Sequence, residues 1–484
     1  MSSRAAKWAA INGGALAPLS LSGPDLAIGV LATFAITGAT AGSVITASGL
    51  PSGWTLNSAA RSLSGTPVVG LKANVILTET LAGKANSPKQ NAIMLELKQV
   101  RVDYDPTGYM GVVNTRFIPP EALNAGLLSI MATRADYACD DIVMPRLKLP
   151  NFFLSTSGEV QATQPRNYNA SIEYPIGTVT PVKWNGSAAG VAAPGNPWLT
   201  SDPIPVTIPR GAFFKLHIRQ ASAEGILIAG NQQAFGAIGD QQTFGANVAD
   251  QTMNPAWVGT AGGNAISGIL IAKTNRPTFM IVSDSRDQGI GNGNNTVPYP
   301  GQTQPALSPR YGVINLSRGS QKASDVATPI NFASRSLLFP NVTHVILNLG
   351  TNDLNGSTVT PAQLTALRSA IRAYAPDKIW WQGTIMPKTT SSDAWATLTG
   401  QTVDSNNANR VAFNDLVRAG QNDFAGYIEL ADPVESSRNS GKLKAPPMTD
   451  AAITGDGNHL NNAGYAMMKP SVEQALGRIA AVRS

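Results

Sequence analysis

The sequence predicts a multidomain protein in which two β-sandwich-like modules precede a C-terminal α/β three-layer sandwich. Up to about residue 268, short runs that alternate apolar and polar residues are separated by turns rich in Gly, Pro, Asn and Ser. From about residue 269, continuous apolar runs alternate with helical patterns, which is typical of a parallel sheet covered by helices. The 484 residues include 46 Gly and 33 Pro but only 14% charged residues, which favours turn-rich β structure. The predicted domains are residues 1–100, 101–268 and 269–484.

The first module, residues 1–100, is predicted from short apolar strands around the segment GLPSGWTLNSAARSLSGTP at residues 49–67. The positions that carry its pattern are Gly49, Leu50, Pro51, Gly53, Leu56, Gly65, Thr66 and Pro67. The segment resembles a bacterial Ig-like repeat family, in which Gly-Leu-Pro-x-Gly precedes a short strand and Ser-Gly-Thr-Pro follows it. The resemblance implies a spacer or adhesion module without chemistry of its own.

The second module, residues 101–268, is predicted from runs such as ASIEYPIGTVTPVKW and PIPVTIPRGAFFKLHIRQ, which alternate apolar and polar residues. The stretch IPRGAFF resembles a strand-turn-strand corner of a jelly-roll-like sandwich. Aromatic side chains in this module either stack on sugar rings or pack half-buried against the sheets, and we interpret them as packing. They are Tyr168, Tyr174, Trp184 and Trp198.

The third domain, residues 269–484, is predicted to contain a five-stranded parallel sheet. Its continuous apolar runs suit strands buried on both faces, at 277–282, 312–316, 344–349, 379–385 and 427–430. One helix is predicted to begin after Thr360 as N-cap, with Pro361 in its first turn. Its apolar stripe comprises Leu364, Leu367, Ile371 and Tyr374. Further helices are predicted over 406–422 and about 461–482, and such folds bind ligands at the carboxyl ends of their strands.

Ser285 is the candidate nucleophile because it lies in the loop SDSRD, directly after the first of these strands. A serine hydroxyl is a poor nucleophile at neutral pH and needs a base within about 3 Å. Of the three histidines, His217 and His344 lie in strand patterns and are interpreted as structural, whereas His459 lies in a Gly/Asn-rich loop before the last helix. Asp456, three residues earlier, can fold its carboxylate back onto that imidazole and fix its tautomer.

Two further strand-end loops offer donors for the negative oxygen of a tetrahedral intermediate. The Asn352 side chain, in the loop GTND, either donates to this oxyanion or caps the strand in an Asx-turn. Gly319, in the loop SRGS, offers a backbone N–H that no side chain covers.

The carboxylates beside Ser285 suggest a metal site as an alternative to a serine nucleophile. Asp284 and Asp287 form one isolated pair without the regular spacing of oxygen ligands that calcium prefers, so no metal is predicted. We expect Asp284 to shape the turn, and Arg286 and Asp287 to lie at the rim of the site as bystanders.

In chain order, the blocks SDS, N…G, GTND and DGNH are similar to those of the SGNH hydrolases of the GDSL esterase/lipase family, over about residues 275–484. The resemblance implies a flavodoxin-like fold and a serine esterase, with Ser285 as nucleophile and His459 as base, oriented by Asp456. It also implies an oxyanion hole formed by the backbone N–H groups of Ser285 and Gly319 and by the Asn352 amide. The residues expected to support these loops are Asp284, Gly350 and Asp353.

The chain departs from the pattern of this family at two points. Ser283 stands where the family has glycine, which serine tolerates if the backbone φ there is not positive. The family glycine lies five residues after the second-strand Asn, but Gly319 lies four after Asn315 and the fifth residue is Ser320. The second backbone donor is therefore either Gly319 or Ser320.

Composition and charge exclude several classes of partner and location. A net charge of +6 without a Lys/Arg-rich run argues against a nucleic-acid partner. The N-terminus has no signal-peptide pattern, and the early apolar stretch LAIGVLATFAITG is too short to span a bilayer. We therefore expect no membrane span, and either a cytoplasmic protein or one that leaves the cell another way, for example in a virion. The single cysteine, Cys139, excludes an intramolecular disulfide, and no cofactor is predicted.

The resulting hypothesis is a serine esterase that removes O-acetyl groups from a carbohydrate polymer, docked by its β modules, in a phage or prophage tail. Its partner would be an acetylated polysaccharide or another ester, and a homo-oligomer or virion assembly stays open. One alternative is a non-catalytic polysaccharide-binding or tail protein on a vestigial hydrolase fold. Another is a lipase or thioesterase, which ranks lower because no lid-like amphipathic segment lies near the four blocks.

Overall fold

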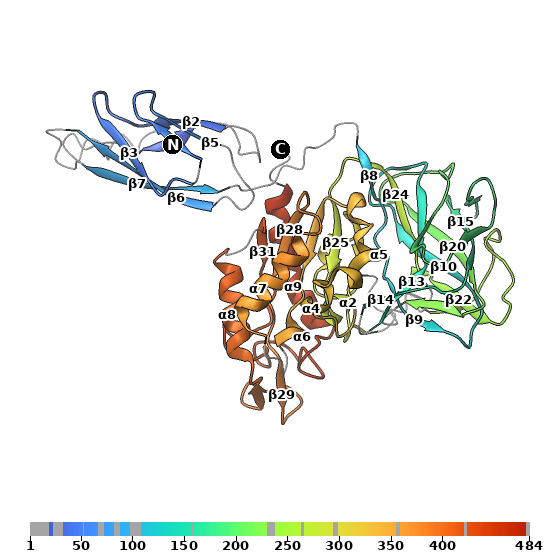
Figure 1. The fold of residues 1–484 in the computed structure, drawn as a ribbon. Helices are drawn as coiled ribbons and strands as arrows, with labels where there is room; N and C mark the ends of the chain where they lie inside the picture. The colour runs from blue at the N-terminus through green and yellow to red at the C-terminus, as the bar shows by residue number, and fades with distance from the viewer. Residues whose placement is uncertain are drawn as a thin grey trace. The chain divides into compact units, whose positions relative to one another are not determined.

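In the computed structural model the chain divides into two compact units, Met1–Val102 and Asp103–Ser484 (Figure 1). The structure describes residues 19–22, 32–51, 53–65, 72–81, 88–96, 108–155, 158–229, 238–262, 266–293, 299–354, 359–420 and 424–480. The second and third predicted domains fall within one unit, and the division of the chain into three domains stays a prediction.

The first unit consists of two antiparallel sheets around one small core. One sheet has the order β1 (Ser20–Ser22), β2 (Ala32–Thr37), β5 (Ser62–Gly65), β4 (Thr55–Asn57), and the other has the order β3 (Val44–Ser48), β6 (Lys72–Thr80), β7 (Lys89–Glu96). Gly65 of the predicted motif lies against Trp54, and a Cβ there would come within 2.3 Å of the indole ring. Glycine is thus required for this close approach. Thr66 and Pro67 lie outside the described residues, and the Ig-like assignment stays a prediction.

Two larger antiparallel sheets form the β-rich part of the second unit. The first has the order β16 (Val179–Pro181), β15 (Arg166–Glu173), β20 (Phe213–Ala221), β10 (Ser129–Tyr137), β22 (Gln241–Gly245), β23 (Thr260–Ala261), with β17 (Gly190–Ala192) paired to β15. The second has the order β18 (Trp198–Thr200), β12 (Arg146–Pro150), β24 (Ile269–Thr274), β8 (Tyr109–Val112). The short pairs are β11 (Ile142–Val143) with β19 (Thr207–Ile208), β13 (Phe152–Ser155) with β14 (Gly158–Gln161), and β9 (Pro120–Asn124) with β21 (Ile226–Ala229).

The aromatic side chains of this part pack inside it, which confirms the packing interpretation. Tyr168, Trp184 and Trp198 are each at most 6% exposed, and Tyr174 packs partly buried against the same core as Tyr168. The Tyr168 hydroxyl donates to a backbone carbonyl at 2.6 Å, and the Trp198 indole N–H donates to the Ser334 carbonyl at 2.8 Å. Such partners are what buried Tyr and Trp side chains require.

The second unit also contains the predicted five-stranded parallel sheet. Its order is β26 (Gly312–Asn315), β25 (Thr278–Val282), β27 (His344–Leu347), β28 (Ile379–Gly383), β31 (Gly426–Ile428). Every residue of the first four of these strands is buried, as their continuous apolar runs indicate. Because β26 and β27 flank β25, the loops that follow these three strands meet at one carboxyl edge.

The helix α7 (Pro361–Arg372) begins at the predicted residue. The Thr360 hydroxyl accepts from the Gln363 N–H and the Gln363 side chain accepts from the Thr360 N–H, which is a capping box. Leu364 and Ile371 are buried, and Leu367 and Tyr374 are partly buried in the same core, so the predicted stripe is confirmed. The other helices are α2 (Ser285–Gln288), α3 (Gln304–Leu307), α4 (Ala323–Val326), η2 (Pro329–Phe332), α5 (Ala333–Ser336), η3 (Phe339–Asn341), α6 (Thr351–Leu354), α8 (Asn407–Arg418) and α9 (Asn462–Ala480); a short hairpin joins β29 (Thr389–Ser391) and β30 (Gln401–Val403).

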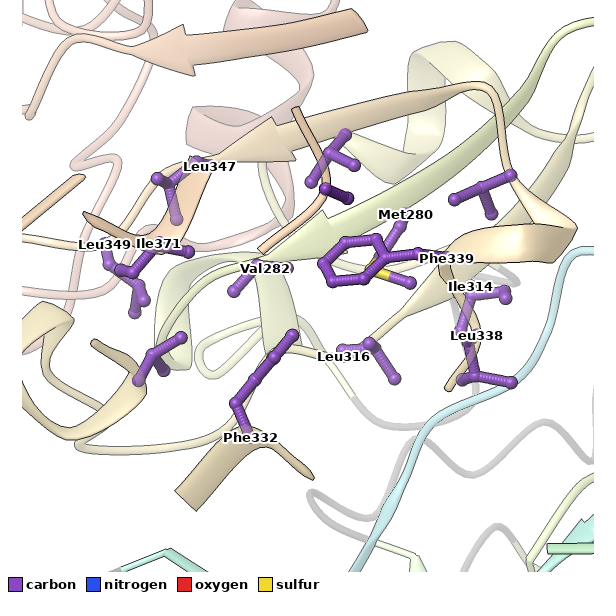
Figure 2. Close-up of a cluster of buried hydrophobic side chains, with 14 of the residues drawn as sticks. Met280, Val282, Ile314, Leu316, Phe332, Leu338, Phe339, Leu347, Leu349 and Ile371 are labelled. Atoms are coloured by element: carbon purple, nitrogen blue, oxygen red, sulfur yellow. The ribbon is translucent and has the colours of Figure 1, made fainter. Parts of the chain in front are cut away.

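One hydrophobic core joins the β-rich part to the parallel sheet. Phe152 and Trp198 of the β-rich part, whose rings meet edge to face at 5.3 Å, belong to the same buried cluster as Met280 and Val282 of β25. Figure 2 shows the part of this cluster that surrounds β25. Each such buried side chain stabilises the fold by about 1.5–3 kcal/mol. Among the described residues, no helix combines the length and the hydropathy that crossing a membrane requires.

Candidate active site

Ser285 lies just beyond the carboxyl end of β25, as the first residue of α2. Asp284 is the N-cap of this helix, and its carboxylate accepts a hydrogen bond from the Arg286 N–H at 3.0 Å. Burial raises the pKa of the Asp284 carboxyl, although the Arg286 guanidinium opposes this shift. Ser283 has a negative φ, so the condition for serine in place of the family glycine is met. Asp284 therefore shapes the turn that presents Ser285.

A chain of hydrogen bonds joins Ser285 to the loop before α9. His459 Nε2 lies 2.8 Å from Ser285 Oγ, and His459 Nδ1 lies 2.7 Å from an Asp456 carboxylate oxygen. The other Asp456 oxygen accepts the backbone N–H groups of His459 at 2.7 Å and Asn458 at 2.8 Å. With Nδ1 donating to the carboxylate, Nε2 is left to accept the serine proton. The structure thus brings together the three residues that the sequence analysis singled out for this chemistry.

Asp456 is held in its ionised form by its partners. Partial burial alone would raise the pKa of this carboxyl, but the backbone N–H and the imidazole of His459 outweigh it and leave the pKa below its ordinary value. Ser285 itself is well enclosed, since the residue is 6% exposed.

Gly319 lies in the loop after β26, and Asn352 lies in the short helix α6 after β27, so the two segments flank the one that carries Ser285. The Asn352 side-chain Nδ2 donates to the Gln321 carbonyl at 3.0 Å, which joins these two loops. Gly319 faces α2, because a Cβ there would lie 3.1 Å from Gln288 Oε1. Ser320, by contrast, is exposed and takes a left-handed φ of 63°.

Gly350 and Asp353 have structural contacts around the loop after β27. Gly350 has a φ of +137°, and a Cβ there would come within 2.8 Å of the Ile385 and Leu364 side chains. The Asp353 carboxylate accepts the backbone N–H groups of Ala323 at 2.7 Å and Ser324 at 3.1 Å, which caps the start of α4. Both residues therefore shape the loop that carries Asn352.

Arg286 and Asp287 are buried, so the prediction that they lie at the rim of the site was wrong. Arg286 is 2% exposed and donates to the Asn458 carbonyl, the Asn458 side chain and the Met386 carbonyl. Asp287 is fully buried, and its carboxylate accepts from Gln302, Thr303 and Asn348. A charged side chain can be buried when several hydrogen bonds replace its contacts with water, as they do for both residues.

Arg286 and Asn458 are functional candidates that the sequence analysis missed. Arg286 follows the candidate nucleophile, and Asn458 precedes the candidate base, so their two hydrogen bonds, of 3.2 and 3.1 Å, join the two loops. The partners are 172 residues apart, and no local pattern in the sequence connects them. The sequence indicates a role for them only through their position, since Arg286 follows Ser285 and Asn458 precedes His459.

The other two histidines have buried structural contacts, which confirms how they were interpreted. His217 is 1% exposed and lies between Thr133 at 2.8 Å and Glu173 at 2.9 Å. His344 bonds to its neighbour Thr343 and stacks on Phe279 at 4.9 Å.

A small pocket lies beside Arg286, and Ser285, Asp456 and His459 are not among the residues that line it. Its lining includes four polar side chains, those of Lys388, Asp404, Asn406 and Asn407. Thr351, which precedes Asn352, lies on its wall, with Met386 and Ile385 supplying apolar surface. The lining surface is thus mostly apolar. Within the described ranges, no group of three or more His, Cys, Asp and Glu side chains is placed to hold a metal ion.

No family model and no curated protein matches the chain. Solved structures that are similar to part of it include a member of the lipolytic G-D-S-L family from Veillonella parvula (14% identity, 42% of this chain and 100% of that chain, TM-score 0.31). A carbohydrate acetylesterase from Sinorhizobium meliloti matches at 13% identity over 43% of this chain and 100% of its own, with a TM-score of 0.29. A family two carbohydrate esterase from Clostridium thermocellum matches at 12% identity over 78% of this chain and 95% of its own, with a TM-score of 0.29. Likeness at this level carries no weight for the chemistry, which rests on the site geometry.

Proposed function

We propose that this protein is a serine esterase that hydrolyses carboxylic esters through an acyl-enzyme on Ser285. The observation that carries the proposal is the pair of hydrogen bonds that link the Ser285 hydroxyl through His459 to Asp456, at 2.8 and 2.7 Å. A serine becomes nucleophilic when a correctly oriented base can take its proton, and this arrangement supplies both the base and its orientation.

In the proposed reaction, His459 Nε2 takes the proton as Ser285 Oγ bonds to the ester carbonyl carbon, and the carbonyl π electrons move to oxygen. The intermediate collapses by breaking the bond to the alcohol oxygen, which leaves with the proton from His459. Water then repeats both steps on the acyl-enzyme, which releases the acid and restores the serine. Donors for the negative oxygen are the backbone N–H groups of Ser285 and Gly319 and the Asn352 amide.

We further propose that the substrate is a short-chain ester of a carbohydrate, with O-acetyl groups as the acyl part. The support is that Lys388, Asp404 and Asn407, which line a small pocket beside Arg286, offer hydrogen-bonding groups to a hydroxyl-rich ligand. The β-rich part shares a core with the parallel sheet. It is thus held close to the reacting centre, where it can contact a large substrate.

Release of acetate from a panel of acetylated polysaccharides tests this function directly. The wild-type protein should release acetate and hydrolyse p-nitrophenyl acetate, and the Ser285→Ala variant should do neither. A serine-directed fluorophosphonate should label the wild type and not this variant. Failure of the wild type both to hydrolyse p-nitrophenyl acetate and to react with the probe would contradict the esterase. A preference for long over short acyl chains would instead favour the lipase or thioesterase.

A further inference from the structure

Arg368 of α7 is a fully buried cation at the carboxyl edge of the parallel sheet. Its guanidinium donates from Nε and Nη2 to the Leu349 carbonyl, at 2.8 and 2.5 Å, and from Nη1 to the Gly383 carbonyl at 3.0 Å. Nη1 also donates to Gln382 Oε1 at 3.3 Å. Leu349 follows β27 and Gly383 ends β28, so this arginine links the carboxyl ends of two neighbouring strands.

The hydrogen-bond acceptors of Arg368 carry no charge. Within the described ranges, four arginines are at most 2% exposed, namely Arg166, Arg286, Arg335 and Arg368. Arg166 and Arg335 each pair with a glutamate, at 2.9 and 2.8 Å. The oxygens that accept from Arg368 and from Arg286 are instead carbonyl and amide oxygens. The two buried arginines with uncharged acceptors are thus the two at the carboxyl edge of the sheet.

The burial of the Arg368 cation opposes folding. It lowers the pKa of the guanidinium to about 9, against the attraction of Asp353 and Asp284, and leaves the group charged at neutral pH. Taking an ion out of water is costly, and well-packed apolar residues often replace buried charges without loss of stability. Stability alone is therefore a weak reason for an arginine at this position.

The Leu349 carbonyl that Arg368 holds lies three residues before Asn352. Between them, Gly350 takes a φ of +137°, and its carbonyl accepts from the Leu354 N–H at 3.0 Å, which closes the single turn of α6. The chain thus turns directly after the carbonyl that Arg368 holds. The direction of the Asn352 side chain depends on this turn.

Arg368 is itself held rigidly. The helix α7 has 12 residues, begins with a capping box and packs its apolar stripe into the core. The guanidinium lies over the Phe413 ring of α8, 4.6 Å from the ring centroid, and this contact fixes its plane. Its hydrogen bonds to the Leu349 carbonyl therefore tie the turn before Asn352 to a rigid part of the fold.

We propose that Arg368 is a positioning residue of the esterase site: by holding the Leu349 carbonyl, it sets the turn at Gly350 and thereby directs the Asn352 amide toward the oxyanion. The inference rests on the proposed function, because Asn352 is one of the oxyanion donors proposed there. Loss of a whole donor costs on the order of 10²–10³ in kcat. A misdirected donor should cost less, so we expect Arg368→Lys, which keeps the charge but not the planar fork, to lower kcat about tenfold.

The test is a double-variant cycle on kcat and KM for p-nitrophenyl acetate, with Arg368→Lys introduced into the wild type and into Asn352→Ala. In the wild type, kcat should fall about tenfold with little change in KM. In Asn352→Ala, the same substitution should change kcat by less than about twofold, because the donor that Arg368 directs is already gone. A general structural defect would lower kcat by the same factor in both backgrounds. Arg368→Met, which removes the charge together with its donors, should depend on Asn352 in the same way and serves if the lysine variant does not fold.

Arg166→Lys is the matched control, because Arg166 is also fully buried but donates to Gln220 and to the Gly225 carbonyl within the β-rich part. It should leave kcat unchanged in both backgrounds. If the wild type turns over but Arg368→Lys lowers kcat equally in both backgrounds, or in neither, the role of Arg368 is overturned and the esterase stands. If the wild type shows neither turnover nor fluorophosphonate labelling, the esterase itself is overturned, and the role of Arg368 falls with it.

Discussion

Arg286 donates two hydrogen bonds to Asn458, from Nε to the carbonyl at 3.2 Å and from Nη2 to the side-chain oxygen at 3.1 Å. These bonds connect the residue after the candidate nucleophile to the residue before the candidate base. A third bond, from Nη1 to the Met386 carbonyl at 3.1 Å, fixes the guanidinium against the loop after β28. The planar fork of arginine therefore sets the distance between the loops that carry Ser285 and His459.

Replacement of Arg286 by lysine should lower kcat by about 100-fold, because a displacement of about 1 Å in a catalytic group costs that much. Lysine keeps the charge but cannot make the three bonds in their present directions. The measurement is kcat and KM with p-nitrophenyl acetate. Arg438→Lys is the control, since Arg438 is an exposed arginine that pairs with Asp432. Equal kcat values for Arg286→Lys and the control would contradict this role.

The three residues of the hydrogen-bonded chain should differ in what their loss costs. Ser285→Ala and His459→Ala should each lower kcat by about 10⁶, and Asp456→Asn by about 10⁴, because asparagine leaves the base in place but no longer fixes its tautomer. The Ser285→Ala/His459→Ala double variant should be no slower than either single variant, since the two act as a unit. Additive losses in the double variant would argue against a shared step. Steady-state kinetics with an activated ester measure all four.

Asn352 and Asp353 are neighbours with different expected roles. Asn352→Ala should lower kcat by about 10²–10³ with little change in KM, because the Asn352 amide would stabilise the oxyanion of the transition state and not the bound substrate. Asp353→Asn should leave kcat nearly unchanged but lower the free energy of unfolding by about 1 kcal/mol. The reason is that a neutral amide accepts the two backbone hydrogen bonds at the start of α4 more weakly than a carboxylate does. Kinetics and urea unfolding of both variants separate the two roles. A catalytic loss in Asp353→Asn that matches the loss in Asn352→Ala would refute the distinction.

The parallel sheet and the position of the candidate site could be predicted because they depend on local patterns. Continuous apolar runs indicate buried strands wherever their partners lie, and the polar residues after each run necessarily meet at one edge. His459 could be selected because the other two histidines, His217 and His344, lie inside strand patterns. Ser285, Asp456 and His459, which follow from these strand-end and loop patterns, are the residues that the structure joins by hydrogen bonds.

The remaining contacts could not be predicted because they depend on side chains far apart in the chain. Arg286 and Asp287 have charges that normally face solvent, and only partners between 15 and 172 residues away allow their burial. Glu121 lies in the β-rich part, and its hydrogen bond with Gln288 of α2 depends on the pairing of Phe117 with Ile314, far along the chain. A sequence pattern does not reveal which irregular segment will pair with the edge of a sheet.

Two glycines of the candidate site should tolerate alanine differently. At Gly350, with φ +137°, a Cβ would come within 2.8 Å of two packed apolar side chains, so Gly350→Ala should destabilise the protein by about 1–3 kcal/mol. At Gly319, a Cβ would meet only the end of the Gln288 side chain at 3.1 Å, which can shift, so Gly319→Ala should change stability by less than about 0.5 kcal/mol. Urea unfolding measures both. A larger loss in Gly319→Ala than in Gly350→Ala would contradict the packing described here.

Burial raises the pKa of the Glu121 carboxyl in β9, and this shift predicts how the stability of the protein depends on pH. Its carboxyl has a pKa of about 7 in the folded protein against an ordinary value of 4.5, so between these values the folded state holds a proton that the unfolded state has lost. The stability conferred by this group is therefore full below about pH 4.5, falls as the pH rises to about 7, and stays constant above it. Glu121→Gln cannot lose a proton and removes this fall. The melting temperature of the variant relative to the wild type should thus be higher at pH 8 than at pH 5. An equal difference at both pH values would show that Glu121 is ionised throughout this range.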